Sequence, residues 1–208
     1  MRSQHILLSF CAALLLVGCS SSKEDQSVKP DESVEVLYNK AAAALDNEDY
    51  ITATKYFDEV ERQHPYSQWA TQAQLMAAYS SYLSQRYDQA IIALDRFIEL
   101  HPGSKDIDYA YYLKALSFYE QISDVRRDQE MTLLALKALD TLIRLYPDST
   151  YSRDAKLKKD LTMDHLAGKE MEIGRYYLNR GHVNASINRF RSVIKEYQTT
   201  THTAEALH

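Results

Sequence analysis

This 208-residue sequence contains few of the side chains that most often act in catalysis or metal binding, and their spacing suits neither role. Its two cysteines, Cys11 and Cys19, both precede the predicted folded part, so we expect no disulfide, zinc cluster or redox pair there. The seven histidines are scattered, and the neighbours Asp164 and His165 point in different directions on a predicted helix. The sequence contains no glycine-rich phosphate loop and no His-Glu-x-x-His motif. We therefore predict no catalytic site, no metal site and no cofactor, and expect a protein that is not an enzyme.

Cys19 is the residue best placed for a chemical modification. Arg2 precedes an apolar run, Ile6 to Val17, whose 12 residues are too few for a membrane span of about 20, so residues 1–18 are predicted to be a signal peptide. The segment Leu16-Val17-Gly18-Cys19 resembles the lipobox of bacterial lipoproteins. This resemblance implies cleavage before Cys19 and acylation of that cysteine. The alternative is an ordinary secretory signal that ends near a chance cysteine.

Residues 19–32 are expected to form a lipidated, flexible tether. After Cys19 they hold a single aliphatic residue and no aromatic one, so they cannot bury enough apolar surface to fold. Several acyl chains on one cysteine would hold the protein stably on a membrane, which a single chain does only marginally. Ser20 occupies the position where similar lipoproteins retained in the inner membrane carry aspartate. The resemblance thus favours the outer membrane, with the protein on the periplasmic face.

One helical pattern recurs through the remainder of the sequence. A small residue is followed at +4 and +7 by large apolar residues and at +12 by proline, as in Ala90, Leu94, Phe97 and Pro102. These steps place three side chains on one stripe of a helix, which the proline ends. Because such a helix cannot bury its stripe alone, the recurrence predicts stacked helical hairpins. The same frame fits Ala53-Phe57-Val60-Pro65 and Ala135-Leu139-Leu142-Pro147, and Ser186-Phe190-Val193 is a weaker fourth copy.

The pattern resembles the second helix of the tetratricopeptide repeat. We therefore predict an all-α solenoid of tetratricopeptide-like hairpins over residues 33–208, with an incomplete last repeat. The serine two residues after each proline is a predicted N-cap of the next helix. The expected helices span 33–46, 50–64, 68–85, 87–101, 106–119, 152–179 and 183–197, and the serines are Ser67, Ser104 and Ser149.

Two stretches stand out for their side chains. Tyrosine is frequent, with 16 residues against 5 Phe and 1 Trp, and such rings suit either groove walls or the half-exposed core of a thin solenoid. The helix predicted over 106–119 places Tyr109 and Tyr112 on one stripe, before a mixed-charge loop, 120–130. That loop is either a solvated bend or part of a groove.

The second stretch is Ile173–Gln198, which contains five basic residues and a single acidic one, Glu196. Its local charge is therefore +4, whereas the whole chain has a net charge of −5. Arg189 has no carboxylate at i±3 or i±4, and Arg180 is equally unpaired. The alternative to a partner site is a solvated basic face. The five are Arg175, Arg180, Arg189, Arg191 and Lys195.

A lipobox followed by irregular helical repeats strongly resembles the BamD family, also called ComL or YfiO. The resemblance rests on Glu61–Ser67, Asp108–Lys114, Tyr119–Gln129, Tyr176–Gly181 and the pair Asn188-Arg189. It implies a lipoprotein subunit of the β-barrel assembly machine of the outer membrane, with five tetratricopeptide-like repeats. Its implied partners are the barrel subunit BamA with its periplasmic modules, other lipoproteins of the machine, and unfolded outer-membrane proteins received in an N-terminal groove.

The resemblance also implies site residues. Arg180 and Arg189 would face a BamA-like partner, and Tyr109, Tyr112, Arg126 and Arg127 are candidates for the walls of the substrate groove. The alternative function is a periplasmic repeat lipoprotein that scaffolds cell-envelope or cell-division enzymes. Nucleic-acid binding is not expected for an acidic periplasmic chain.

Overall fold

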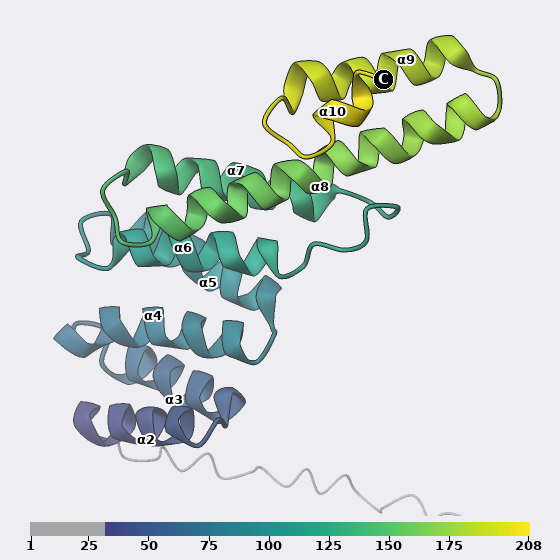
Figure 1. Cartoon of the computed structure of the whole chain (residues 1–208). Helices are drawn as coiled ribbons and strands as arrows, with labels where there is room; N and C mark the ends of the chain where they lie inside the picture. The colour runs from purple at the N-terminus through teal and green to yellow at the C-terminus, as the bar shows by residue number, and fades with distance from the viewer. Residues whose placement is uncertain (1–31) are drawn as a thin grey trace, which may run out of the picture. The chain divides into compact units, whose positions relative to one another are not determined.

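Each copy of the sequence pattern forms the second helix of an antiparallel hairpin in the computed structural model, which describes residues 32–208 (Figure 1). An all-α solenoid was predicted, and the described residues confirm it. The helices are α2 (Val34–Asp46), α3 (Tyr50–Gln63), α4 (Gln68–Leu83), α5 (Tyr87–Leu100), α6 (Ile107–Tyr119), α7 (Glu130–Leu145), α8 (Ser152–Asn179), α9 (Val183–Glu196) and α10 (Thr203–Ala206).

Each helix packs mainly against its neighbours in the sequence, as stacked hairpins require. The first helices of successive hairpins, α2, α4, α6 and α8, also contact one another in series. The core accordingly consists of four hydrophobic clusters in series rather than a single centre. Each cluster is shared by three successive helices. A helix in the middle of the series is therefore packed on two sides: Ala110 and Leu113 of α6 belong to the cluster with α4 and α5, and Ala115 belongs to the cluster with α7 and α8.

The repeated stripe is buried in the core of the described residues. Its members are at most 1% exposed, except Phe190 in the weak fourth copy, which is partly buried. The residues at 1% or below are Ala53, Phe57, Val60, Ala90, Leu94, Phe97, Ala135, Leu139, Leu142, Ser186 and Val193. The burial of these residues confirms the predicted frame, with Phe190 of the weak fourth copy less deeply buried than its counterparts.

The turns inside three hairpins also repeat. Glu48, Gln85 and Gly181 have positive φ values of 60°, 60° and 78° at equivalent places. In each turn the next N–H bonds back to a carbonyl five residues earlier, for example His182 N to Tyr177 O at 2.9 Å. This arrangement closes the first helix of the hairpin. It also explains why α4 ends at Leu83, shorter than the predicted 68–85.

The predicted serine caps are right in one case of three. Ser67 caps α4 and accepts from Ala70 N at 3.1 Å. Ser104 and Ser149 do not cap, because α6 and α8 begin later, at Ile107 and Ser152. Ser149 instead donates to the Asp108 carboxylate at 2.7 Å. The hydroxyls of Ser104 and Ser149 therefore stabilise loops rather than helix starts.

Gly174 on α8 lies directly against the Phe190 ring of α9. A Cβ at this position would lie 2.3 Å from Phe190 Cε1 and 2.7 Å from Cδ1, far below van der Waals contact. Gly174 lies 12 residues before Ser186, as the fully buried Ala41 lies 12 residues before Ala53 in the first hairpin, so both are small residues at equivalent helix crossings.

We expect Gly174→Ala to lower the melting temperature, because displacing the Phe190 ring costs about 1 to 3 kcal/mol. The better helix propensity of alanine returns at most about 1 kcal/mol. Gly168→Ala is the matched control, since its Cβ would meet His202 Nε2 at 3.1 Å, the end of a side chain. Thermal unfolding compares the two, and equal melting temperatures would contradict the close crossing.

Candidate binding surfaces

Four tyrosine rings from different hairpins form a row, which we call the tyrosine row: Tyr79, Tyr109, Tyr112 and Tyr151. Tyr79 lies on α4, Tyr109 and Tyr112 on α6, and Tyr151 at the start of α8. The ring centroids of Tyr79 and Tyr109 are 6.4 Å apart, and those of Tyr109 and Tyr151 are 5.2 Å apart. Tyr112 stacks on Tyr151 at 5.0 Å. All four are half-buried, so each ring leaves part of its surface for a ligand.

The row ends in a polar group on α8. The Tyr112 hydroxyl donates to Asp154 Oδ2 at 2.6 Å, and Lys158 Nζ lies 2.8 Å from the same oxygen. Hydrogen bonds from Lys158 and Tyr112 lower the pKa of Asp154. Burial raises the pKa of Tyr109, and burial with the Asp154 hydrogen bond raises that of Tyr112. At neutral pH the two hydroxyls are therefore un-ionised next to an ionised carboxylate.

The two arginines predicted to share this groove lie elsewhere. Arg126 is exposed in the loop after α6, and its Nε is 3.7 Å from Glu172 on α8. Asp154, the partner of Tyr112, is 18 residues before Glu172 on the same helix, or about 27 Å along its axis. The hypothesis that Arg126 and Arg127 lie near Tyr109 and Tyr112 is therefore wrong.

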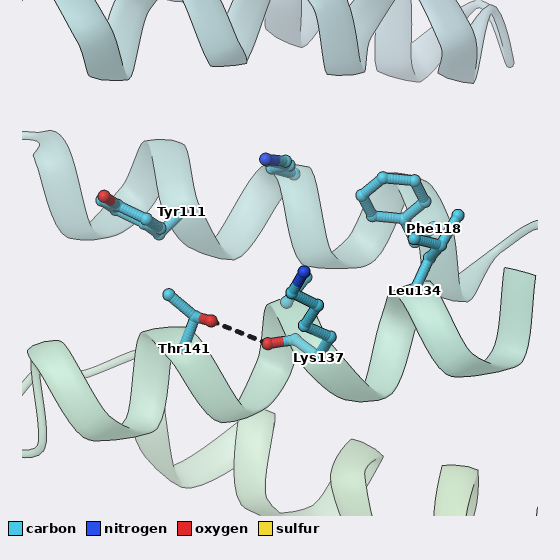
Figure 2. A pocket seen from close by; sticks show the side chains of 7 residues that line it. Tyr111, Phe118, Leu134, Lys137 and Thr141 are labelled. Carbon is cyan, nitrogen blue, oxygen red and sulfur yellow. Dashed lines mark hydrogen bonds between the residues drawn. The ribbon is translucent and has the colours of Figure 1, made fainter.

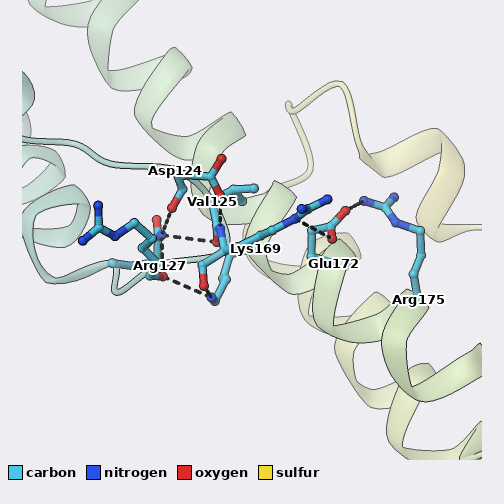
Figure 3. Close-up of polar contacts among 8 residues, drawn as sticks. Asp124, Val125, Arg127, Lys169, Glu172 and Arg175 are labelled. Carbon is cyan, nitrogen blue, oxygen red and sulfur yellow. Dashed lines mark hydrogen bonds and ion pairs between the residues drawn. The ribbon is translucent and has the colours of Figure 1, made fainter. Parts of the chain in front are cut away.

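The 120–129 loop is instead held against α8 (Figure 3). Lys169 Nζ donates to the carbonyls of Arg126 and Arg127 at 2.9 and 3.1 Å. Glu172 pairs with Arg175 at 2.7 Å, which lowers the pKa of Glu172, and Arg175 also pairs with Glu205 on α10 at 2.7 Å. Residues of α8 thus connect the loop and α10.

Arg189 and Arg180 both have intramolecular contacts that were not predicted. Arg189 Nη1 lies 3.1 Å from Glu170 Oε2, on the facing helix α8, so the prediction that it is unpaired is wrong. The Arg180 guanidinium lies over the Tyr176 ring, 4.6 Å from its centroid. Arg180 and Glu170 are ten residues, about 15 Å, apart along α8 and its C-cap. The two arginines therefore occupy separate places on one hairpin.

A pocket between α6 and α7 was not predicted (Figure 2). It has a volume of about 160 Å³ and is lined by Tyr111, Phe118 and Leu134 with Lys114 and Lys137. Lys114 pairs with Asp95 on α5. The residues that line the pocket show only the ordinary periodicity of a helix surface, so the sequence contains no signal that predicts the pocket.

Some predicted features lie outside the described residues, namely the signal peptide 1–18, Cys19 and the tether as far as residue 31. Within residues 32–208, no helix is long and apolar enough to cross a membrane. In the same range no group of three or more His, Cys, Asp or Glu side chains could hold a metal ion.

Comparison with known proteins identifies the family. A family model named YfiO and described as "Outer membrane lipoprotein" matches residues 30–208. A protein of Caulobacter vibrioides is 47% identical over 207 residues, covering 99% of this chain and 68% of the relative. One from Rickettsia prowazekii is 46% identical over 195 residues, covering 94% and 77%. One from Neisseria meningitidis serogroup B is 34% identical over 217 residues, covering 98% and 81%.

All three relatives are named "Outer membrane protein assembly factor BamD". Among solved structures, MamA 41-end from Desulfovibrio magneticus RS-1 is 17% identical, covers 80% of this chain and 77% of its own, and gives a TM-score of 0.44. The resemblance drawn from the sequence is confirmed by the family model and by identity over nearly the whole chain. The chain therefore belongs to the BamD/YfiO family of outer-membrane assembly lipoproteins.

Proposed function

We propose that this outer-membrane lipoprotein is a non-catalytic scaffold of the β-barrel assembly machinery, which binds a BamA-like barrel protein and segments of unfolded outer-membrane proteins. The observation that carries the proposal is the family match over residues 30–208, with relatives named as assembly factors. A solenoid supports such a role, because its stacked hairpins expose long continuous faces to a partner. No observation favours the alternative, a scaffold for envelope or cell-division enzymes.

The tyrosine row is the proposed contact for unfolded segments. Extended chains bind through apolar side-chain contacts and through backbone hydrogen bonds, and half-buried tyrosines offer both a ring face and a hydroxyl. The Tyr112 hydroxyl is committed to Asp154, so Tyr112 would contribute mainly its ring. Arg126 and Arg127 are not part of this proposed contact, because they lie in the loop after α6, beside Lys169 and Glu172 of α8.

Site-specific photo-crosslinking tests this contact. Crosslinkers at Tyr109 and Tyr112 are expected to capture a peptide from the end of an unfolded barrel protein. Ile92, 69% exposed on α5, is the control position, on a helix that carries none of the tyrosine row. Crosslinks that arise equally or exclusively from Ile92 would show that the tyrosine row is not the substrate contact.

The C-terminal hairpin is the proposed contact for the BamA-like partner, through Arg180 and Arg189. Both guanidinium groups are held by neighbours of the same chain, which orders them before a partner arrives. Arg189 is 43% exposed in its side chain, so it can exchange or share the Glu170 contact. Other lipoproteins of the machinery are further proposed partners.

Cys19→Ala is expected to remove the acyl anchor. Without the sulfur no acyl chain can be added at this residue, and the signal is left uncleaved at this site. Palmitate labelling and membrane flotation measure the loss, and Cys11→Ala, within the predicted signal peptide, is the matched control. Undiminished labelling of the Cys19→Ala protein would refute the assignment of Cys19 as the anchor.

A further inference from the structure

Two exposed aromatic residues, three positions apart in the sequence, lie at the junction between α3 and α4, which we call the α3–α4 corner (His64–Trp69). The Tyr66 side chain is fully exposed, at 101% of its reference surface, and Trp69 is 40% exposed. Tyr66 therefore contributes nothing to the core, although aromatic rings are favoured where they can leave water. Pro65 and Gln68 beside them are also exposed, so the corner projects from the first hairpins.

Trp69 is held in a fixed orientation by the core behind it. Its ring centroid lies 4.8 Å from that of Tyr38, which in turn packs against the buried Phe57 at 5.4 Å. One side of the indole is thus packed and the other faces outward. A ring fixed in this way loses little conformational freedom when its exposed side becomes covered.

The chain enters the folded unit beside this corner. The backbone N–H of Glu32 donates to Gln63 Oε1 at 2.9 Å, and the Glu32 carbonyl contacts His64 Nε2 at 2.6 Å. Both groups of Glu32 are therefore bound at the end of α3, immediately before Tyr66. Cys19 is 13 residues upstream, and a chain of that length cannot span more than about 45 Å even when fully extended.

Two acidic groups near the corner, Glu32 and Glu59, are paired with basic side chains. Lys40 pairs with Glu32, and Arg62 binds Glu59 at 2.5 Å. Paired carboxylates repel an anionic surface less than free ones do. Glu35 is exposed in the first turn of α2. Because a charged carboxylate is costly to place among acyl chains, any contact of this region with a membrane stays at the level of the headgroups.

We propose that the α3–α4 corner rests on the phospholipid surface of the membrane that holds the lipid anchor, with Tyr66 and Trp69 at the headgroup level. The inference rests on the proposed acylation of Cys19, which brings the corner within reach of that surface. Tyrosine and tryptophan are the side chains preferred at membrane–water interfaces, because their rings are apolar and their O–H and N–H groups stay hydrated. The anchor raises the local concentration of the corner at the membrane, so a weak contact suffices to fix the orientation of the first hairpins.

Tryptophan fluorescence tests the contact directly, because Trp69 is the single tryptophan of the sequence. The mature lipoprotein is reconstituted in vesicles of phosphatidylethanolamine and phosphatidylglycerol, with or without bromine on the acyl chains. We expect the emission of Trp69 to shift to shorter wavelength in vesicles and to be quenched by the brominated lipid. Tyr66→Ser should reduce both effects, whereas Tyr176→Ser, which removes a tyrosine 53% exposed on α8, should leave them unchanged.

Flotation of the same vesicles separates the two hypotheses. A protein that floats while Trp69 is neither shifted nor quenched would overturn the corner contact and leave the lipid anchor intact. A protein that does not float would overturn both. A shift that appears without lipid and grows with protein concentration would identify a second copy of the chain, rather than the membrane, as the ligand of the corner, and would also overturn the inference.

Discussion

Phe97→Ala is expected to lower the free energy of unfolding by about 3 to 5 kcal/mol, the usual cost of truncating a buried phenylalanine. Phe97 is 1% exposed and lies in the cluster that joins the second hairpin to α6. The truncation leaves a void in a cluster to which residues of α4, α5 and α6 all contribute. Because each hairpin contacts mainly its neighbours, the void also weakens the connection between the N-terminal hairpins and the rest of the solenoid.

Chemical denaturation monitored by circular dichroism measures this loss. Ile92→Ala is the matched control on the same helix, since Ile92 is 69% exposed and a surface change of this kind stays within about 0.5 kcal/mol. A broadened or two-step transition for Phe97→Ala is expected if the hairpins uncouple. Equal effects of the two substitutions would mean that the repeated stripe is not the core.

The repeated stripe shows why much of the fold could be predicted. Ala90, Leu94 and Phe97 are separated by four and three residues, so their burial on one helix face follows from helix geometry alone. Proline then marks the end of the helix, and the recurrence of the pattern predicts that successive helical hairpins stack on one another. These signals are local, and local signals suffice for a fold whose contacts are mostly between neighbouring helices.

The side-chain partners could not be predicted in the same way. Tyr112 bonds to Asp154, 42 residues later, and Arg126 pairs with Glu172, 46 residues later. Such pairs depend on the rotation and register of helices in different hairpins, which hydrophobic periodicity does not specify to within one residue. The loop 120–129 adds an irregular step, so Arg126 could not be placed relative to the tyrosines from the sequence.

Arg189 illustrates the same limit. A search at i±3 and i±4 along α9 finds no carboxylate, yet Glu170 faces it from α8, 19 residues earlier. The contact changes the expected consequence of a substitution. Arg189→Glu would place two carboxylates against each other and lower stability, in addition to any effect on a partner. The side chains are 43% and 21% exposed, so the intramolecular pair is worth about 0.2 to 1 kcal/mol.

We expect Arg189→Glu to abolish copurification of the BamA-like partner. Removing one member of a charge pair buried in an interface costs about 2 to 5 kcal/mol, which is a loss of affinity of roughly 30-fold to several thousand-fold. This loss of binding free energy is larger than the roughly 0.2 to 1 kcal/mol of stability expected from the Arg189–Glu170 pair, so the two effects can be measured separately. Affinity purification from solubilised membranes measures the partner, and thermal unfolding of the same preparation measures the fold.

A charge swap within the chain distinguishes the two roles of Arg189. Combining Glu170→Arg with Arg189→Glu restores an opposite-charge pair between α8 and α9, so the melting temperature should return close to its original value. If Arg189 contacts the partner, copurification stays lost in the double variant and is recovered by an acidic-to-basic change on the partner. If the double variant recovers the partner unaided, the Arg189–Glu170 contact acts only within the hairpin, and the interface must be sought elsewhere, beginning with Arg180 at the turn between α8 and α9.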